Sequence, residues 1–373
     1  MATSQRAKIL LLIPHLGGGG AERIAATLAR YLNPLRYELH LGLVTQSSHE
    51  ARAIPTGGTV HTLGATRVRY GAWRLLWLVW RVRPAVILSG MAHLNLLVLL
   101  LRPFFPTGTR VFVRQNGPLA ATLAIGGKPR LSRQLYGAGY RRADRVICQT
   151  QLMADELQTE LGINSAKLAV LSNPVNVQAI RAIAAVTNYI PPSPGPRLTA
   201  IARLAPEKGI DLLLGAFAGV LRTFPHAELE IAGSGQCESA LKAQCRMLGI
   251  ESRVNFLGNV AEPASLFHRS SLFVLSSRHE GMPNALLEAA AAGLPIVALP
   301  ASPGLVERVR GRSGIWIASD ISAYALENTL CDALASIHSG QRFEHAWIGP
   351  FDLTNAIPAY ERVIDEALRE CRT

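Results

Sequence analysis

The feature that most constrains the fold is a series of short, unbroken apolar runs, each followed by a turn and a helical segment. Runs such as Ile9–Ile13 and Leu272–Leu275 show no polar alternation, which is typical of parallel strands covered on both faces. Strands that alternate with helices predict open parallel sheets. Because the series restarts after a Pro-rich stretch at 188–196, the chain is predicted to contain two α/β domains.

We expect a first Rossmann-like domain over residues 1–173, a linker region over 174–196, a second Rossmann-like domain over 197–350 and a C-terminal helix over 351–373. That last helix can cross back to the first domain. A chain of 373 residues is long enough for two domains of ordinary size. In doubly wound sheets of this kind, function is expected at the carboxyl ends of the strands.

The net charge of +12 is distributed unevenly along the chain. Residues 1–173 hold 21 Lys and Arg against 7 Asp and Glu, whereas residues 174–373 hold 17 against 19. A strongly basic first half suits a phosphorylated substrate, an anionic lipid or nucleic acid. Nucleic acid is disfavoured, because nothing in the chain resembles a nucleic-acid-binding module.

The cysteines and the N-terminus favour a reducing, cytoplasmic setting. The five cysteines, at 148, 237, 245, 331 and 371, form no Cys-x-x-Cys and are odd in number, so they predict neither a disulfide framework nor a zinc site. Lys8 precedes only five apolar residues before Pro14, too few for a signal-peptide core. No stretch reaches the roughly 18 apolar residues that a membrane-spanning helix needs.

One predicted helix, over about 70–82, carries Trp73, Trp77 and Trp80 on a single face, with arginines among them. Two interpretations stay open. The face can pack into the core of the first domain. Alternatively it can lie on a membrane surface, where indole rings sit at the headgroup level and arginine meets lipid phosphate.

A strand, loop and helix over 272–292 form the strongest candidate for a binding site. The loop carries Glu280, and Pro283 and Asn284 are typical of a helix start. The first amides of a helix are unpaired donors at the positive end of its dipole, so they suit an anion such as a diphosphate. A helical span would separate Glu280 from Glu288 by about 12 Å. The two carboxylates are therefore no acid/base pair, but each can accept hydrogen bonds from hydroxyls of a sugar or a ribose.

Three further motifs follow predicted strands. The glycine loop Gly17–Gly20 lets the backbone approach a phosphate or sugar, although a plain tight turn would look the same. Arg203 and Lys208 lie at the mouth of the second sheet, where both can bind phosphate; the simpler interpretation is a surface ion pair with Glu207. Gly233–Gly235 fits a ligand packed against bare backbone.

Together these segments resemble the retaining, two-domain glycosyltransferases of the GT-B fold, in family four of the usual classification. The resemblance is carried by Gly18-Gly19-Gly20-Ala21-Glu22-Arg23, Ser172–Val175, Arg203-Leu204 with Lys208-Gly209, Gly233–Gly235, Val254–Gly258, and Glu280–Asn284 through Glu288-Ala289. It spans nearly the whole chain and is closest in character to bacterial enzymes that build polysaccharide, lipopolysaccharide or lipid-linked oligosaccharide. It implies two Rossmann-like, doubly wound α/β domains facing across a cleft.

The resemblance also implies catalytic roles. Arg203 and Lys208 would neutralise the donor diphosphate, and Glu280 would hold a hydroxyl of the transferred sugar. His93 would lie near the reacting sugar or the acceptor. The other donor-binding positions that it implies are Gly18, Gly19, Gly233, Leu257, Gly281, Met282, Pro283, Asn284, Ala285, Leu286 and Glu288.

Within that donor set, Glu288 would hold the ribose hydroxyls, and backbone near Asn284 would cap the distal phosphate. Gly18 and Gly19 would face the diphosphate across the cleft, and the segment ending at Leu257 would border the base. On the acceptor side the matching positions are Asn95, Arg114 and Asn116. The family varies there, so their roles are hypotheses.

The resemblance further implies transfer with retention, in which the leaving phosphate oxygen helps to deprotonate the acceptor. The chain has no Asp-x-Asp tripeptide, and cations with a helix N-terminus can stabilise a leaving diphosphate, so we expect no metal and no other cofactor. UDP is the favoured nucleotide. The basic first half, with its tryptophan face, predicts a polyprenyl-diphosphate-linked or other glycan acceptor at the anionic inner face of the cytoplasmic membrane.

Two competing functions are kept. A nucleotide-sugar epimerase of the same architecture would share the donor site, but it needs acid/base residues for proton transfer, and no strong set is visible. A non-catalytic binder of nucleic acid or other anions would use the basic half alone.

Overall fold

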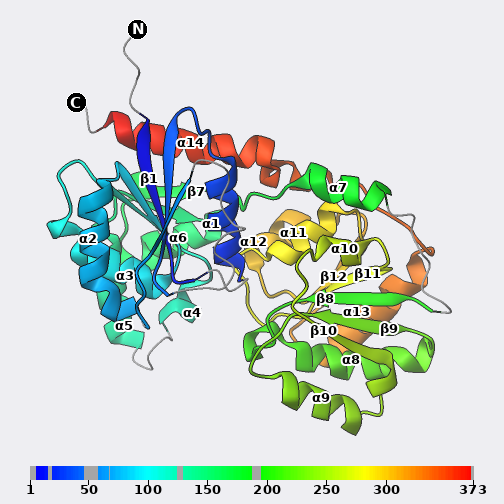
Figure 1. Cartoon of the computed structure of the whole chain (residues 1–373). Helices are drawn as coiled ribbons and strands as arrows, with labels where there is room; N and C mark the ends of the chain where they lie inside the picture. Colours follow the sequence, from blue (N-terminus) through cyan, green and yellow to red (C-terminus); the bar gives the residue numbers. More distant parts are fainter. Residues whose placement is uncertain are drawn as a thin grey trace. The chain divides into compact units, whose positions relative to one another are not determined.

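The structure is a computed structural model that describes residues 6–15, 19–45, 58–66, 68–123, 129–186 and 195–370. The chain divides into two compact units (Figure 1). Unit 1 comprises Met1–Pro174 and Leu353–Thr373, and unit 2 comprises Val175–Asp352. Most of the Pro-rich segment predicted as a linker lies outside the described residues.

Unit 1 is built on a parallel sheet with the strand order β3-β2-β1-β4-β5-β6-β7 among the described residues. The strands are β1 (Ala7–Ile13), β2 (Tyr37–Leu43), β3 (Thr59–Thr62), β4 (Val86–Ser89), β5 (Arg110–Arg114), β6 (Arg145–Cys148) and β7 (Leu168–Val170). Residues Ile9–Ile13 of the central strand are all at most 1% exposed, because helices cover both faces of the sheet. Edge strand β3 is short and largely polar, and the sequence alone did not predict a strand there.

Helices form one layer on each face of that sheet. One layer holds α2 (Ala72–Val82), α3 (Ala92–Leu101), α4 (Leu119–Leu123), α5 (Pro129–Tyr140) and α6 (Gln151–Leu161), and the other holds α1 (Gly20–Tyr31) and α14 (Leu353–Arg369). Short 3-10 turns are η2 (Val68–Gly71), η3 (Arg102–Phe104) and η4 (Ser165–Lys167).

Helices α4 and α5 lie in the basic segment 119–142, where the sequence alone did not predict a helix. The glycines in this segment lower helix propensity, which concealed the helix. Gly139 allows close packing, because a Cβ on it would lie only 3.1 Å from Leu96 Cδ2 of α3. On the same helix Tyr136 and Tyr140 are buried one turn apart, so tertiary burial outweighs the weak local preference.

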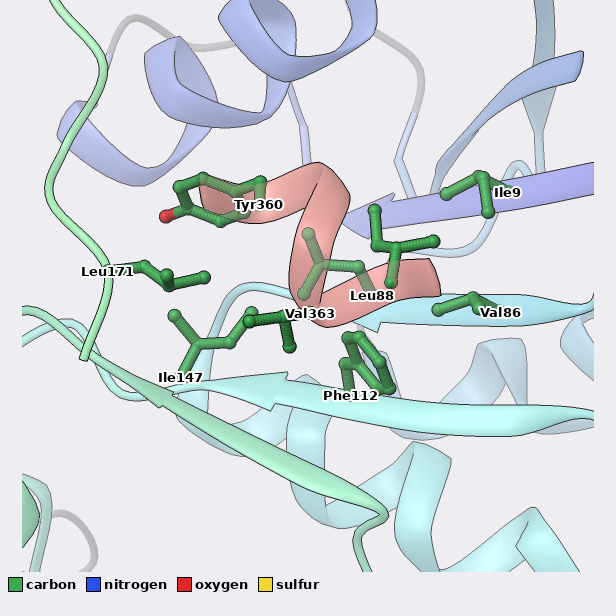
Figure 2. Close-up of a pocket in the computed structure, with 9 residues that line it drawn as sticks. Ile9, Val86, Leu88, Phe112, Ile147, Leu171, Tyr360 and Val363 are labelled. Atoms are coloured by element: carbon green, nitrogen blue, oxygen red, sulfur yellow. The ribbon is translucent and has the colours of Figure 1, made fainter. Parts of the chain in front are cut away.

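The C-terminal helix α14 belongs to unit 1. Tyr37 donates its hydroxyl to Asp365 Oδ1 at 2.7 Å, and the backbone N–H of Asn33 donates to Glu361 Oε1 at 2.8 Å. Figure 2 shows side chains of β1, β4, β5 and β6 facing Tyr360 and Val363 across an apolar void. The void measures about 10 Å³, too small for a substrate, so this contact is structural.

Unit 2 repeats the architecture with the strand order β10-β9-β8-β11-β12-β13, again all parallel. The strands are β8 (Arg197–Ile201), β9 (Glu228–Ala232), β10 (Val254–Gly258), β11 (Leu272–Leu275), β12 (Ile296–Ala298) and β13 (Ile315–Ile317). The helices are α7 (Val177–Val186), α8 (Ile210–Thr223), α9 (Glu238–Met247), α10 (Ala264–Phe267), α11 (Asn284–Ala291), α12 (Pro303–Val309) and α13 (Ala323–Ser336), with 3-10 turns η5 (Pro206–Lys208), η6 (Glu251–Arg253) and η7 (Ala346–Phe351). Two parallel sheets with alternating helices confirm the predicted fold class.

The tryptophan face of α2 is not part of the core. Trp73, Trp77 and Trp80 are 78%, 56% and 50% exposed, whereas the opposite face of the helix, led by Leu75 and Val79, is fully buried. Of the two interpretations made from the sequence, core packing is therefore wrong. Within the described residues, no helix has the length and apolar character needed to cross a membrane.

Candidate functional site

The predicted donor-binding residues of unit 2 lie on loops that leave the carboxyl edge of its sheet. Arg203 and Lys208 follow β8, Gly233 follows β9, and Glu280 follows β11. Strand β8 lies between β9 and β11 in the sheet, so these loops are neighbours in space although up to 72 residues separate their contacting side chains. This edge is the usual binding edge of a doubly wound sheet.

Lys208 and Glu280 form an ion pair at the centre of this edge. Lys208 Nζ lies 2.5 Å from Glu280 Oε1, and Ser277 Oγ donates to the same oxygen at 2.8 Å. The two charged side chains are 22% and 15% exposed, so the pair is largely desolvated yet reachable. Lys208, which is expected to bind phosphate, and Glu280, which is expected to bind the sugar, are therefore in direct contact. A ligand phosphate would compete with Glu280 for the ammonium group.

The β8 and β11 loops are joined by backbone contacts around Lys208. Ser276 Oγ donates to Lys208 O at 3.0 Å. Gly209 has a φ of +61°, and a Cβ at this position would overlap Ser276 O. Only glycine combines the left-handed conformation with so close an approach. The sequence signal for this junction was the Lys208-Gly209 pair, whose glycine had no assigned role.

Arg278 clamps the same junction and was missed at the level of sequence. Its guanidinium donates to Asp211 Oδ1 at 2.8 Å, to Asp211 Oδ2 at 2.6 Å and to Pro206 O at 2.7 Å. The hydrogen bond from Arg278 lowers the pKa of Asp211 below its ordinary value, so the carboxylate stays ionised at neutral pH. A bidentate pair of this kind fixes the loop that carries Lys208.

Arg203 is available to a ligand. Its side chain is 70% exposed and lies 2.6 Å from Glu207 Oε1. Burial works to raise the pKa of Glu207, but hydrogen bonds from backbone and from Arg203 outweigh it, so the pKa is lowered. An exposed pair like this contributes little to stability. Arg203 can therefore exchange Glu207 for phosphate oxygens at small cost.

Gly233 is needed for protein packing. Its φ is +133°, and a Cβ would overlap Ala202 O; a Cβ on Gly235 would overlap Leu204 O. The bare backbone of this turn thus packs on the β8 loop. Contact of Gly233 with a ligand stays a prediction. Leu257 is half-buried near the end of the next strand, whose Gly258 accepts a 2.7 Å hydrogen bond from Gly233 N–H.

Helix α11 offers its backbone, not most of its side chains. Gly281, Met282 and Pro283 are buried, as is Leu286, whereas Asn284 and Ala285 are half-buried. No side chain caps this helix start, and the first amides of any helix lack intrahelical acceptors. Glu288, one helical turn beyond Asn284, is 8% exposed. At this helix, backbone amides of the α11 N-terminus can thus bind a ligand phosphate.

In unit 1, two histidines come together where the adjacent strands β1 and β4 end. His15 follows β1, and its Nδ1 lies 3.7 Å from Glu22 Oε1 of α1. His93 is exposed on the first turn of α3. Desolvation, followed by repulsion from His15, lowers the pKa of His93. The sequence predicted a role for His93 alone. Nothing in the sequence near His15 shows that its loop lies beside the end of β4.

The glycine loop of unit 1 is only partly described, since Gly18 lies outside the described residues. Gly19 precedes α1, and a Cβ on it would overlap the carboxylate of Glu22, which is 6% exposed. A carboxylate therefore already occupies the positive end of this helix dipole. This placement makes the start of α1 a poor site for a second anion.

The residues expected on the acceptor side form a buried polar network. Asn95, which is fully buried, donates its Nδ2 to Arg114 O at 3.0 Å and to Tyr140 Oη at 3.1 Å. Arg114 is 3% exposed and donates to the side-chain oxygens of Asn116 and Asn173. Only Asn116 of the three predicted residues is partly accessible. Direct contact of Asn95 or Arg114 with an acceptor is therefore disfavoured; both position their neighbours.

The lowered pKa of His93 predicts a pH effect. The ordinary pKa of histidine is 6.5 and that of folded His93 is lower, so the ring is mainly neutral at pH 7. The stability that depends on the neutral ring is present above pH 6.5 and is lost as pH falls through the folded-state pKa. If the neutral ring binds substrate, kcat/KM should be flat from neutral to mildly alkaline pH and fall only in acid. His15→Gln should raise the pKa of His93 and move the acid limb to higher pH. His338→Gln is the control and should leave the acid limb of the pH profile unchanged. If the acid limb is also unchanged in His15→Gln, this assignment is contradicted.

Across the described part of the chain, no cluster of three or more His, Cys, Asp or Glu side chains is arranged to hold a metal ion. The four described cysteines are free.

Two doubly wound parallel units, the second with cations and a helix N-terminus at its binding edge, define a protein of the GT-B class. Residues 18–179 match the family described as "Glycosyltransferase Family 4", and residues 195–336 match "Glycosyl transferases group 1". Together the two matches cover most of the chain. The chain therefore belongs to these glycosyltransferases.

Individual proteins that are similar to this chain support the same family. An uncharacterized glycosyltransferase of Haemophilus influenzae is 37% identical over 112 residues, which is 30% of this chain and 32% of that protein. Glycogen synthase of Mycobacterium tuberculosis is 30% identical over 249 residues, 64% of this chain and 59% of that protein. The matched segments thus span less than two thirds of either relative. The Anabaena HepE structure, in complex with UDP and glucose, superposes with a TM-score of 0.77 at 18% identity, covering 96% of this chain and 100% of that chain, which supports the fold.

Proposed function

We propose that the chain transfers a hexose or N-acetylhexosamine from a nucleotide-diphosphate sugar to a glycan or polyprenyl-diphosphate-linked acceptor, with retention, in cell-envelope polysaccharide or lipopolysaccharide synthesis. The observation that carries the proposal is the convergence of Lys208, Arg203, Glu280 and the α11 N-terminus at one edge of unit 2. UDP is favoured as the nucleotide, because HepE was solved with UDP and with UDP-glucose.

In the proposed reaction, the bond between the sugar C1 and the diphosphate breaks while a bond from C1 to the acceptor oxygen forms on the same face. The acceptor proton passes to the leaving phosphate oxygen. Arg203 and Lys208 would neutralise the diphosphate, and the α11 amides would bind its distal phosphate. Fixed cations of this kind are the basis for proposing transfer without a metal.

Glu280 is proposed to orient the sugar and not to attack it. When phosphate draws Lys208 away, Glu280 Oε1 keeps the hydrogen bond from Ser277 and gains freedom to accept from a sugar hydroxyl. Glu288 is proposed to accept from the ribose hydroxyls. In unit 1, His93 is proposed to bind the transferred sugar or the acceptor. The acceptor's phosphate groups would suit the basic charge of the first half at the inner face of the cytoplasmic membrane.

A thermal-shift screen against a panel of nucleotide sugars tests the donor. A ligand that binds only the native state raises the melting temperature, and at one hundred times its Kd it adds about 2.7 kcal/mol. We expect a UDP-sugar to give the largest shift. Arg203→Ala should reduce that shift. Arg222→Ala is the matched control, because Arg222 is an equally exposed arginine that lies 2.6 Å from Glu327. No shift with any nucleotide sugar, or an equal loss in the control, would count against the proposal.

Metal independence is tested with the same donor. Transfer to a lipid-linked acceptor should continue in excess chelator at close to its initial rate. Activity that disappears on chelation and returns with a divalent cation would contradict the proposed mechanism, while leaving the family assignment intact.

A further inference from the structure

The exposed aromatic face of α2 has no covering element among the described residues of unit 1. In addition to the three tryptophans, Phe104 of η3 and Leu100 of α3 are 63% and 65% exposed. Trp80 Nε1 donates to Phe104 O at 2.9 Å, which joins η3 to α2. An exposed group of large apolar side chains, beyond single scattered ones, marks an interaction surface.

Arginines stack on this aromatic face. The guanidinium carbon of Arg81 lies 5.0 Å from the centre of the Trp77 ring, and that of Arg83 lies 5.9 Å from the centre of the Trp80 ring. Arg83 ends α2 with a φ of +50°, and among the described residues it is the one non-glycine with a positive φ. Glycine would be the unstrained residue there, so an arginine is kept at a backbone cost.

A basic hollow adjoins Phe104. It has a volume of about 360 Å³ and is lined by Arg102, Pro103, Arg142 and Lys167. Arg102 shares the Asp144 carboxylate with Arg110. The ion pairs found among the described residues include neither Arg142 nor Lys167. Lys167 Nζ donates to Arg141 O at 2.7 Å, but a carbonyl does not neutralise an ammonium group, so the hollow carries net positive charge.

The composition of the segment that builds this surface also favours binding of anions. Residues 51–143, which include α2, η3 and α5, contain fourteen Lys and Arg and no Asp or Glu. The absence of acidic residues from this segment keeps its surface attractive to anions. The hollow also lies at the amino ends of β5, β6 and β7, because Arg142 and Lys167 immediately precede β6 and β7. It is thus at the opposite sheet edge from Asn116 and His93 and is separate from the reaction site.

We propose that this surface docks unit 1 on an anionic phospholipid bilayer, with the indole rings at the headgroup level and a lipid phosphate in the hollow of Arg102, Arg142 and Lys167. Aromatic rings flanked by arginine are suited to the interface between headgroups and acyl chains. A nucleic acid would use the cations but would not require the solvent-exposed stripe of Trp73 and Trp77. The inference deepens the proposed membrane location, but it does not depend on which sugar is transferred.

Co-sedimentation of the full chain with phosphatidylcholine vesicles, with and without phosphatidylglycerol, tests the proposal. Wild type should bind only the anionic vesicles, and its tryptophan emission should shift to the blue and be quenched by brominated lipid. Arg142→Gln/Lys167→Gln should weaken binding by about fivefold for each cation removed. Trp73→Ser/Trp77→Ser should weaken it at least about tenfold.

Helix α1, on the other face of the sheet, supplies a matched control. The Arg30 guanidinium carbon lies 5.7 Å from the centre of the Tyr31 ring, an arginine–aromatic pair outside the proposed surface. Arg30→Gln/Tyr31→Ser should bind vesicles like wild type. The proposal is overturned if wild type does not prefer anionic vesicles, or if the control loses as much binding as the surface variants. It is also overturned if a DNA duplex displaces the vesicles while the tryptophan variants bind normally. No donor or acceptor is present in this assay, so its failure leaves the proposed transfer reaction standing.

Discussion

Lys208→Met is expected to reduce kcat/KM for the nucleotide-sugar donor by at least about 100-fold, the loss typical of removing a preorganised charge from a developing anion. Glu280→Gln should have a loss of similar size, because the sugar would lose a charged acceptor. Each single change also leaves a partly buried charge without its partner at 2.5 Å, so each should destabilise the fold. The measurements are steady-state kinetics and denaturant unfolding.

The double variant Lys208→Met/Glu280→Gln separates structure from chemistry. Removing both charges should restore most of the stability, while activity stays low. Lys242→Met is the matched control, because Lys242 pairs with Glu238 at 2.7 Å on the exposed surface of α9; it should change neither quantity appreciably. If Lys208→Met retained activity within about tenfold of wild type, its proposed role on the diphosphate would be wrong.

Gly209→Ala is expected to cost about 2–4 kcal/mol of unfolding free energy and to abolish donor binding. The alanine would be strained at φ +61°, and its Cβ would overlap Ser276 O, so strain and overpacking add together. Relief would require the β8 and β11 loops to separate, which would draw Lys208 away from Glu280. Denaturant unfolding and calorimetric titration with the donor measure the two effects.

Gly249→Ala isolates the conformational part of that cost. Gly249 has a φ of +66°, but a Cβ there meets nothing within 4 Å, so the variant should lose only about 1 kcal/mol and keep donor binding. Equal destabilisation of the two variants would show that contact with Ser276 is unimportant.

The sequence predicted the strands and helices of unit 2 well because that information is local. The apolar run Leu272–Leu275 is β11, and the predicted helix start at Pro283 and Asn284 is the N-terminus of α11. Turn glycines after β8 and β9 were recognised, although the packing of Gly233 was not, since its missing Cβ faces a carbonyl from another loop. Helix α5 was missed for a similar reason: its stability comes from burial of Tyr136 and Tyr140 against other elements.

By itself, the sequence determined the alternation of strands and helices, the two-unit organisation and the identity of the charged residues that follow each strand. These properties depend on short-range periodicity and on turn chemistry, which neighbouring residues encode. Only the tertiary structure decided that Lys208 and Glu280 form a pair, that Arg114 is buried and that the tryptophans of α2 are exposed. Each of those outcomes depends on which distant segment covers a face or borders a strand, and the periodicity of one segment does not specify its partner.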